Sequence, residues 1–173
     1  MTPIDLLTDA HARIPGAVHG VLDGLDPAHL TARPDPGTNS IAWLLWHLTR
    51  VQDDHVAGVA GREQVWTAQG WARRFALPLD DADTGYQHTP EQVAVVDASA
   101  ADLAGYHDAV HEHTRAYLET LSPDDLDRVV DDAWDPPVTL GVRLVSVIDD
   151  DVAHAAQAMF LRGILQRAAG TTG

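Results

Sequence analysis

The chain has 173 residues, a formal net charge of −15 at pH 7, 45% hydrophobic residues and no cysteine. Its length and hydrophobic content are typical of one globular domain, so we expect residues 1–173 to form a single domain. The strong negative charge argues against binding to nucleic acid or to an anionic membrane surface, because both need clustered cations. The lack of cysteine excludes disulfides, thiolate metal sites and a cysteine nucleophile.

The start of the chain shows no basic segment followed by an apolar run, and no stretch approaches 18 uninterrupted apolar residues. We therefore expect neither a signal peptide nor a transmembrane helix, and we expect a cytoplasmic protein. Ten histidines are a high count for this length, and they are the one compositional indication of metal or proton chemistry.

The first predicted helix runs from about Pro3 to Leu25, with Thr2 as its N-cap. Proline removes a backbone donor inside a helix, so we expect Pro15-Gly16 to bend or interrupt it. A proline-rich connection then leads to the second helix.

The second helix is predicted over residues 40–60, with Asn39 or Ser40 as its cap and Gly61 at its end. The segment 62–97 contains glycine and proline turn signals, and we expect it to be a long excursion with one or two short helices. A loop of this length in a compact protein usually has a function, often that of covering a site.

The third predicted helix begins after Ser99 and ends near Thr120. We expect a short helix and turn over residues 122–132, then an extended or hairpin-like stretch at 131–141. The fourth helix, from about Leu140 to Ala169, is the longest. Four long amphipathic helices with little strand predict an all-α fold, a four-helix bundle. The long segment between the second and third helices predicts a crossover connection there.

His47 interrupts an apolar part of the second helix. At about 100° per residue, Ile41, Leu44 and Leu48 fall on the core-facing stripe, and His47 lies about 60° from Leu44 at its rim. A side chain at that position faces the seam between helices. For one histidine considered alone, a hydrogen-bonded residue at the edge of the core is a simpler interpretation than a metal ligand.

The fourth helix carries a second polar interruption, Asp150 and His154 at positions i and i+4 of an otherwise apolar stripe. This spacing puts two side chains one turn apart on one face, as in helical metal sites, whereas Asp151 is offset and is a weaker competitor. A structural Asp–His hydrogen bond is the alternative. With His47, the pair would form a three-ligand set suited to Zn²⁺, Ni²⁺ or Fe²⁺, but spacing alone cannot join residues so far apart.

The stretches NSIAWLLWHLTRVQDDHV (39–56) and DDDVAHAAQAMFLRG (149–163) resemble the DinB/YfiT-like superfamily of metalloenzymes, which includes mycothiol-dependent maleylpyruvate isomerase. Family members present one histidine from the second helix and an i,i+4 pair, usually His/His or Glu/His, from the last. The resemblance implies that His47, Asp150 and His154 bind one divalent metal, with zinc first and nickel or iron as alternatives. It also implies a homodimer. Asp150 departs from the pattern, because aspartate is shorter than glutamate and less basic than histidine.

Several other polar residues allow two interpretations. Arg50 and Arg143 are candidates to bind a carboxylate of a thiol cofactor or substrate, and the alternative for each is a salt bridge to a nearby acid. Asp54 either orients a ligand or is a solvated carboxylate. His107 and His111 are predicted to be surface or rim residues and not metal ligands.

The leading functional hypothesis is a small metal-dependent enzyme that acts on a small-molecule substrate. Since the chain has no cysteine, a thiol nucleophile would have to come from a small molecule such as mycothiol or bacillithiol, which the resemblance suggests. We therefore favour a thiol-dependent transferase or isomerase over a metal-dependent hydrolase. The alternative class is a non-catalytic bundle, stress-linked or ligand-binding, in which Asp150 and the histidines form a structural network. The sequence identifies no catalytic residue beyond the metal ligands.

Overall fold

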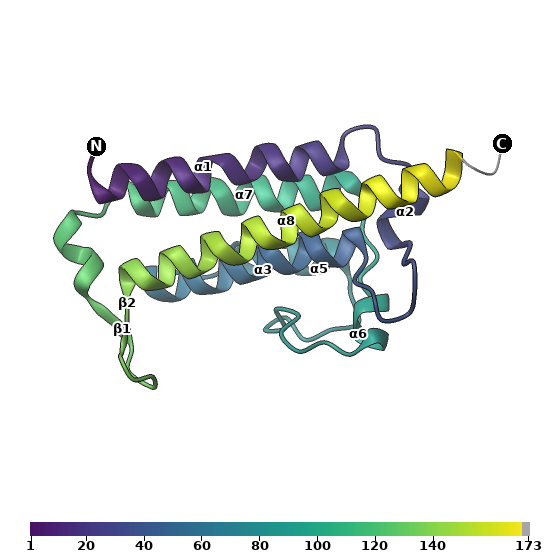
Figure 1. The fold of residues 1–173 in the computed structure, drawn as a ribbon. Coiled ribbons are helices and arrows are strands. Elements are labelled where there is room, and N and C mark those ends of the chain that lie inside the picture. The colour runs from purple at the N-terminus through teal and green to yellow at the C-terminus, as the bar shows by residue number, and fades with distance from the viewer. Residues whose placement is uncertain (171–173) are drawn as a thin grey trace.

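The computed structural model describes residues 1–170, so the last three residues of the predicted domain lie outside it. Four long helices form the body of the molecule (Figure 1): α1 (Pro3–Leu22), α3 (Ile41–Ala60), α7 (Ala100–Leu118) and α8 (Leu140–Gly170). Both α1 and α3 pack against α7 and α8, so the helices form a ring in the order α1, α7, α3, α8. The predicted all-α four-helix bundle is confirmed.

The remaining described elements are short and connect the long helices. They are α2 (Pro27–Thr31), α4 (Val65–Ala68), α5 (Trp71–Phe75), α6 (Pro90–Ala94), the 3₁₀ helix η1 (Pro123–Asp127), β1 (Val129–Asp131) and β2 (Val138–Thr139). The two strands pair antiparallel, with Val129 opposite Thr139, so the hairpin-like stretch before the last helix is confirmed. None of the helices in residues 1–170 has the length and continuous apolar character that a membrane span requires.

The helices α1 and α3 begin where their capping residues predict, and α3 also ends where predicted. The side chain of Thr2 accepts a hydrogen bond from the amide of Asp5, and that of Ser40 accepts one from the amide of Trp43. Gly61 ends α3 in the left-handed region, at a φ of 63° that glycine adopts without steric cost.

The expected interruption at Pro15 is wrong, because α1 is one continuous 20-residue helix that ends at Leu22 and not at Leu25. Ile14 and Val18 flank the proline, and both are buried in the core. The apolar contacts of these neighbours outweigh the backbone hydrogen bond that a proline cannot donate.

The predicted crossover between α3 and α7 is confirmed. These two helices run in the same direction (Figure 1), so the chain has to return along the bundle between them. The returning segment holds three short helices where one or two were expected. It covers the outer face of α3, so every residue from 41 to 50 is buried. Trp66 of this segment packs on Tyr106 of α7, with 5.0 Å between ring centroids.

The apolar core consists of two clusters. The larger one includes Val18, Leu45 and Leu103, and the smaller one includes Leu118 and Leu140 near the start of α8. Each long helix has a buried polar side chain between the parts that it contributes to the two clusters. These side chains are His11, Gln52, Thr114 and Asp151. A polar layer of this kind weakens the core relative to continuous apolar packing, because buried polar groups lose their contacts with water.

His107 belongs to the interior, which contradicts its predicted surface or rim position. Its side chain is fully buried, and its Nδ1 lies 3.3 Å from the hydroxyl of Thr49. Since α7 packs against both α1 and α3, its buried face is wider than one apolar stripe, and a single-helix wheel does not reveal that width. His111 is half-buried, as a rim residue would be.

Acid is expected to destabilise this protein through its buried histidines. Burial lowers the pKa of His11 to about 4 and that of His107 to about 3, from 6.5. Below pH 6.5 the unfolded chain therefore binds more protons than the folded one, so stability is complete above this pH and falls as the pH drops toward 4. His11 alone should cost about 3 kcal/mol at the acidic limit.

Urea unfolding of wild type and His11→Gln between pH 7 and about pH 4 measures this effect. The variant should lose less stability over this range. Asp151 acts in the opposite direction, since burial raises the pKa of its carboxyl, but it is common to both proteins. Equal pH slopes for the two proteins would contradict the prediction.

Candidate metal centre

Three potential ligands meet at the seam between α3 and α8. His47 comes from α3, and Asp150 and His154 come from adjacent turns of α8. One nitrogen or oxygen atom of each lies within 4.8 Å of the corresponding atoms of the other two. Within residues 1–170 no other three histidine, aspartate or glutamate side chains approach one another in this way. The tertiary structure thus joins the two polar interruptions that sequence spacing could not pair.

The imidazole of His47 is held between aromatic and polar neighbours. Trp43, one helical turn earlier on α3, stacks on it with 4.5 Å between ring centroids and an interplanar angle of 14°. The ring of His154 lies 4.9 Å away across the seam. His47 is only 7% exposed, and this burial lowers its pKa, so the neutral imidazole that a metal requires is favoured.

The backbone carbonyl of Thr84 sets the tautomer of His47. The His47 Nδ1 lies 2.5 Å from this oxygen, which can only accept, so Nδ1 carries the proton and donates it. The lone pair of Nε2 is then available to a metal. Sequence analysis missed this contact, because a backbone carbonyl in a loop leaves no signature in the residue types.

Asp150 shows a feature that fits a bound cation. Its Oδ1 lies 3.6 Å from the Nε2 of His154, while its Oδ2 is buried without a hydrogen-bond partner. A buried carboxylate oxygen without a partner is costly, and a divalent cation would satisfy it. His154 Nδ1 lies 3.3 Å from the side-chain oxygen of Gln157, which leaves Nε2 facing Asp150. Two imidazoles and a carboxylate are a donor set suited to zinc.

The predicted position of Asp150 and His154 at the centre of the buried stripe of α8 needs correction. The buried face runs through Asp151, Ala155 and Ala158, and the side chains of Asp150 and His154 lie at its rim, 31% and 18% exposed. Asp151 is fully buried in the bundle, which agrees with its being the weaker competitor for the ligand role. The rim position leaves the candidate metal centre accessible from solvent.

Two adjoining cavities lie beside these ligands. One, of about 480 Å³, is lined by His47 and Asp150, and the other, of about 440 Å³, is lined by Arg143. Asp54 and His55 line both. The guanidinium of Arg143 donates to the carboxylate of Asp131 at 2.9 Å, which is the salt bridge expected as its alternative role.

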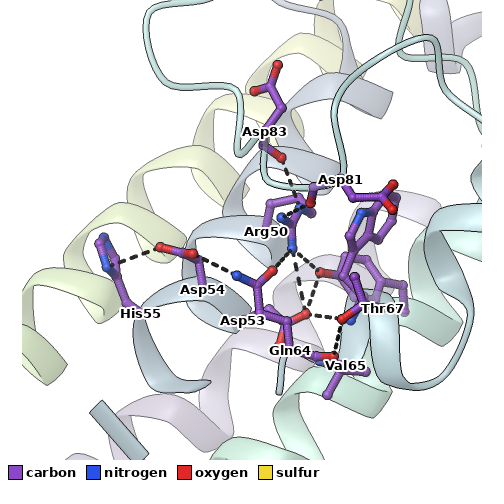
Figure 2. Close-up of polar contacts among 11 residues, drawn as sticks. Arg50, Asp53, Asp54, His55, Gln64, Val65, Thr67, Asp81 and Asp83 are labelled. Atoms are coloured by element: carbon purple, nitrogen blue, oxygen red, sulfur yellow. Dashed lines mark hydrogen bonds and ion pairs between the residues drawn. The ribbon is translucent and has the colours of Figure 1, made fainter. Parts of the chain in front are cut away.

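Arg50 does not have the predicted role in binding a carboxylate. Its side chain is fully buried and lines neither cavity. Figure 2 shows its guanidinium donating to the backbone carbonyls of Asp81 and Asp83, at 2.9 and 3.1 Å, and to the side-chain oxygen of Gln64, at 2.7 Å. Arg50 therefore holds the crossover segment against α3.

Asp53 is the carboxylate that accompanies Arg50, and sequence analysis did not single it out. It lies 3.8 Å from the Arg50 guanidinium and accepts hydrogen bonds from the amides of Val65 and Trp66 and from the hydroxyl of Tyr106. These bonds attach the start of α4 to α3. Asp54, in contrast, accepts from the side-chain Nε2 of Gln64 at 2.7 Å and has no hydrogen bond to His47.

The far end of the same crossover segment lies against His47 and Trp43. The carboxylate of Asp83 accepts from the amide of Gly85 at 2.7 Å and lies 2.9 Å from the Nε2 of His88. His88 in turn accepts from the indole N–H of Trp43 at 3.1 Å. The partners of Arg50 are thus continuous with the loop that contacts His47.

Replacing Gly85 with alanine is expected to weaken metal binding about 10–100-fold, as loss of outer-shell contacts does in other metal sites. A Cβ at this position would lie 2.7 Å from His47 Nδ1 and 3.0 Å from the ring of Trp46. The φ of 89° is also unfavourable for alanine. The loop must shift and with it the Thr84 carbonyl.

Zinc affinity measured by competition with a chromophoric chelator tests this expectation. Gly58→Ala, in the last turn of α3, is the matched control, because its added Cβ would meet nothing within 4 Å. It should keep the wild-type affinity. Wild-type affinity in Gly85→Ala would show that the loop contact does not position His47.

Comparison with known proteins identifies a family and a structural neighbour. The family model described as the DinB superfamily matches residues 10–158. A crystal structure of a conserved protein from Enterococcus faecalis is similar, with 35% sequence identity, a TM-score of 0.87, and coverage of 94% of this chain and 96% of that one. A comparison with proteins of curated function finds no match.

Proposed function

The chain belongs to the DinB superfamily, and from this premise we propose that it is a metal-dependent enzyme whose His47, Asp150 and His154 bind one divalent cation. Zinc is the first candidate, with nickel or iron as alternatives. The observation that carries the proposal is the convergence of these ligands from two helices, together with the partnerless Oδ2 of Asp150. Three protein ligands leave coordination positions open, as in catalytic sites and unlike closed structural ones.

The residues around the site have separate tasks in this proposal. A bound divalent cation supplies Lewis acidity, which polarises a carbonyl or lowers the pKa of a thiol. Thr84 keeps the Nε2 of His47 unprotonated, and Trp43 restricts the orientation of the ring. The cavity of about 480 Å³ is large enough to admit a small-molecule substrate beside His47 and Asp150.

Metal content tests the proposal directly. Protein purified without a histidine tag should bind about one equivalent of zinc, and removal of the metal should lower the melting temperature. At a zinc concentration of about 1,000 Kd, binding contributes about 4 kcal/mol of stability. Excess zinc should restore the melting temperature after chelation. Absence of stoichiometric metal with an unchanged melting temperature would favour the alternative, a non-catalytic bundle with a structural Asp/His network.

We further propose that the reaction is a thiol-dependent transfer or isomerisation, with mycothiol or bacillithiol as the thiol. The support is the family resemblance, and since the chain has no cysteine, a thiol nucleophile would have to come from a bound molecule. Arg143 is the residue we propose for a carboxylate of that thiol, since it lines the adjoining cavity. A metal-dependent hydrolase is the alternative. Titration of the Co²⁺-substituted protein with these thiols distinguishes the two, because an unchanged absorption spectrum would exclude thiol binding at the metal.

The homodimer remains a proposal. An apolar groove of about 410 Å³ between α1 and α8 supports it, with Ile14, Val152 and Met159 among its lining residues. Val152 and Met159 are 51% and 44% exposed, although both are apolar. An exposed apolar face of this kind favours association, and the molar mass from light scattering tests it.

A further inference from the structure

The cavity of about 480 Å³ beside the metal ligands is lined by two aromatic side chains from outside the helix bundle. Besides His47 and Asp150, Tyr86 and Trp134 line it. These aromatic residues come from segments outside the four-helix bundle: Tyr86 from the crossover between α5 and α6, and Trp134 from the turn between β1 and β2. Both segments project from the same side of the bundle (Figure 1).

Both aromatic side chains are largely exposed, although burial would stabilise them. Tyr86 is 78% exposed and Trp134 is 67% exposed. The other four tryptophans are buried or half-buried and pack against the protein. Large aromatic rings kept in water beside a cavity indicate a surface that becomes covered when a ligand binds. Because the two rings line the same cavity as His47 and Asp150, a molecule bound against them would also lie beside the metal ligands.

The charges of the cavity limit the kind of ligand. Asp54 and Asp150 are among its lining residues, and within the described residues no arginine lines it. Arg143 lines the adjoining cavity and is paired with Asp131. The metal would be occupied by the donor atom of the ligand, and the lining offers no arginine to a negatively charged ring beside Asp54. An uncharged ring, in contrast, would bury apolar surface against the aromatic side chains.

We propose that Tyr86 and Trp134 form a binding site for an uncharged aromatic ring, or a similarly flat apolar ring, of the substrate. The ring lies against these two side chains while a donor atom of the same molecule faces the metal ligands. This site rests on the proposed metal-dependent function, and it makes Tyr86 and Trp134 specificity-determining residues that do not take part in the chemistry.

Two hydroxamates that share one chelating group test the ring site. Acetohydroxamate and benzohydroxamate are titrated into the Co²⁺-substituted protein, and their affinities are read from the visible spectrum. Wild type should bind benzohydroxamate about tenfold more tightly, a difference of about 1.4 kcal/mol, because its ring contacts two aromatic side chains that acetohydroxamate does not reach. In the Tyr86→Ala/Trp134→Ala protein the ratio of affinities should fall to about one, while the affinity for acetohydroxamate is unchanged.

Phe160→Ala is the matched control, because Phe160 is 70% exposed on α8 but does not line this cavity. It should keep the wild-type ratio, and Trp134→Phe should retain most of it. Failure of Co²⁺ to bind would overturn the metal proposal and the ring site together. Normal Co²⁺ and acetohydroxamate binding without a preference for benzohydroxamate, or with a preference that the double variant keeps, would overturn the ring site alone.

Discussion

His154→Ala is expected to weaken zinc binding by more than about a hundredfold, which exceeds the effect of removing an outer-shell partner. The substitution removes one of three ligands, and two remaining protein ligands form a poor zinc site. The metal-free protein should lose little stability, because the side chains of His154 and Asp150 are partly exposed and 3.6 Å apart. Isothermal titration with zinc and thermal unfolding of the metal-free protein measure the two quantities.

His19→Ala is the matched control for this variant. His19 also pairs with an aspartate, since its Nε2 lies 2.8 Å from Asp108, but this pair is half-exposed between α1 and α7. The control should keep the wild-type zinc affinity. A structural Asp/His network predicts the reverse for His154→Ala, namely a stability loss of a few kcal/mol in metal-free protein with no zinc affinity to lose. That result would reject the metal centre.

Arg50→Met is expected to lower the free energy of unfolding by about 3–5 kcal/mol, the usual cost of removing one partner of a buried ion pair. The change leaves Asp53 without its cation in a buried environment. It also deprives the carbonyls of Asp81 and Asp83 of their donors. Zinc affinity should fall as well, because the same segment positions Thr84 against His47. Urea unfolding gives the first quantity, and chelator competition the second.

Arg115→Met is the control for loss of an arginine. Arg115 forms ion pairs with Glu112 and Glu119 on the surface of α7, and its side chain is 43% exposed. Its removal should change stability by less than about 1 kcal/mol. Arg50→Lys offers an intermediate case, because lysine keeps the charge but loses the planar fork of donors. A loss below about 1 kcal/mol for Arg50→Met would show that the guanidinium does not hold the crossover segment.

Local patterns in the sequence were sufficient to locate the four long helices and the ligand pair on α8. Capping residues such as Thr2 and Ser40 bind backbone groups within a few residues of themselves. The start of a helix can therefore be predicted from the local sequence alone. The i,i+4 spacing of Asp150 and His154 is likewise a property of one helix. The long segment after α3 predicted a crossover by its length, since structureless loops of this length are uncommon in compact domains.

The tertiary structure decided every relation between segments. Pairing His47 with α8 depends on which helices are neighbours, and the burial of Asp151 beside a partly exposed Asp150 depends on how α8 is rotated about its axis. The sequence wheel placed the buried face of α8 wrongly because the helix packs against two neighbours. The roles of Arg50 and Thr84 depend on backbone carbonyls of a loop about 30 residues away. A carbonyl is common to all residue types, so only the folded chain shows which one a side chain meets.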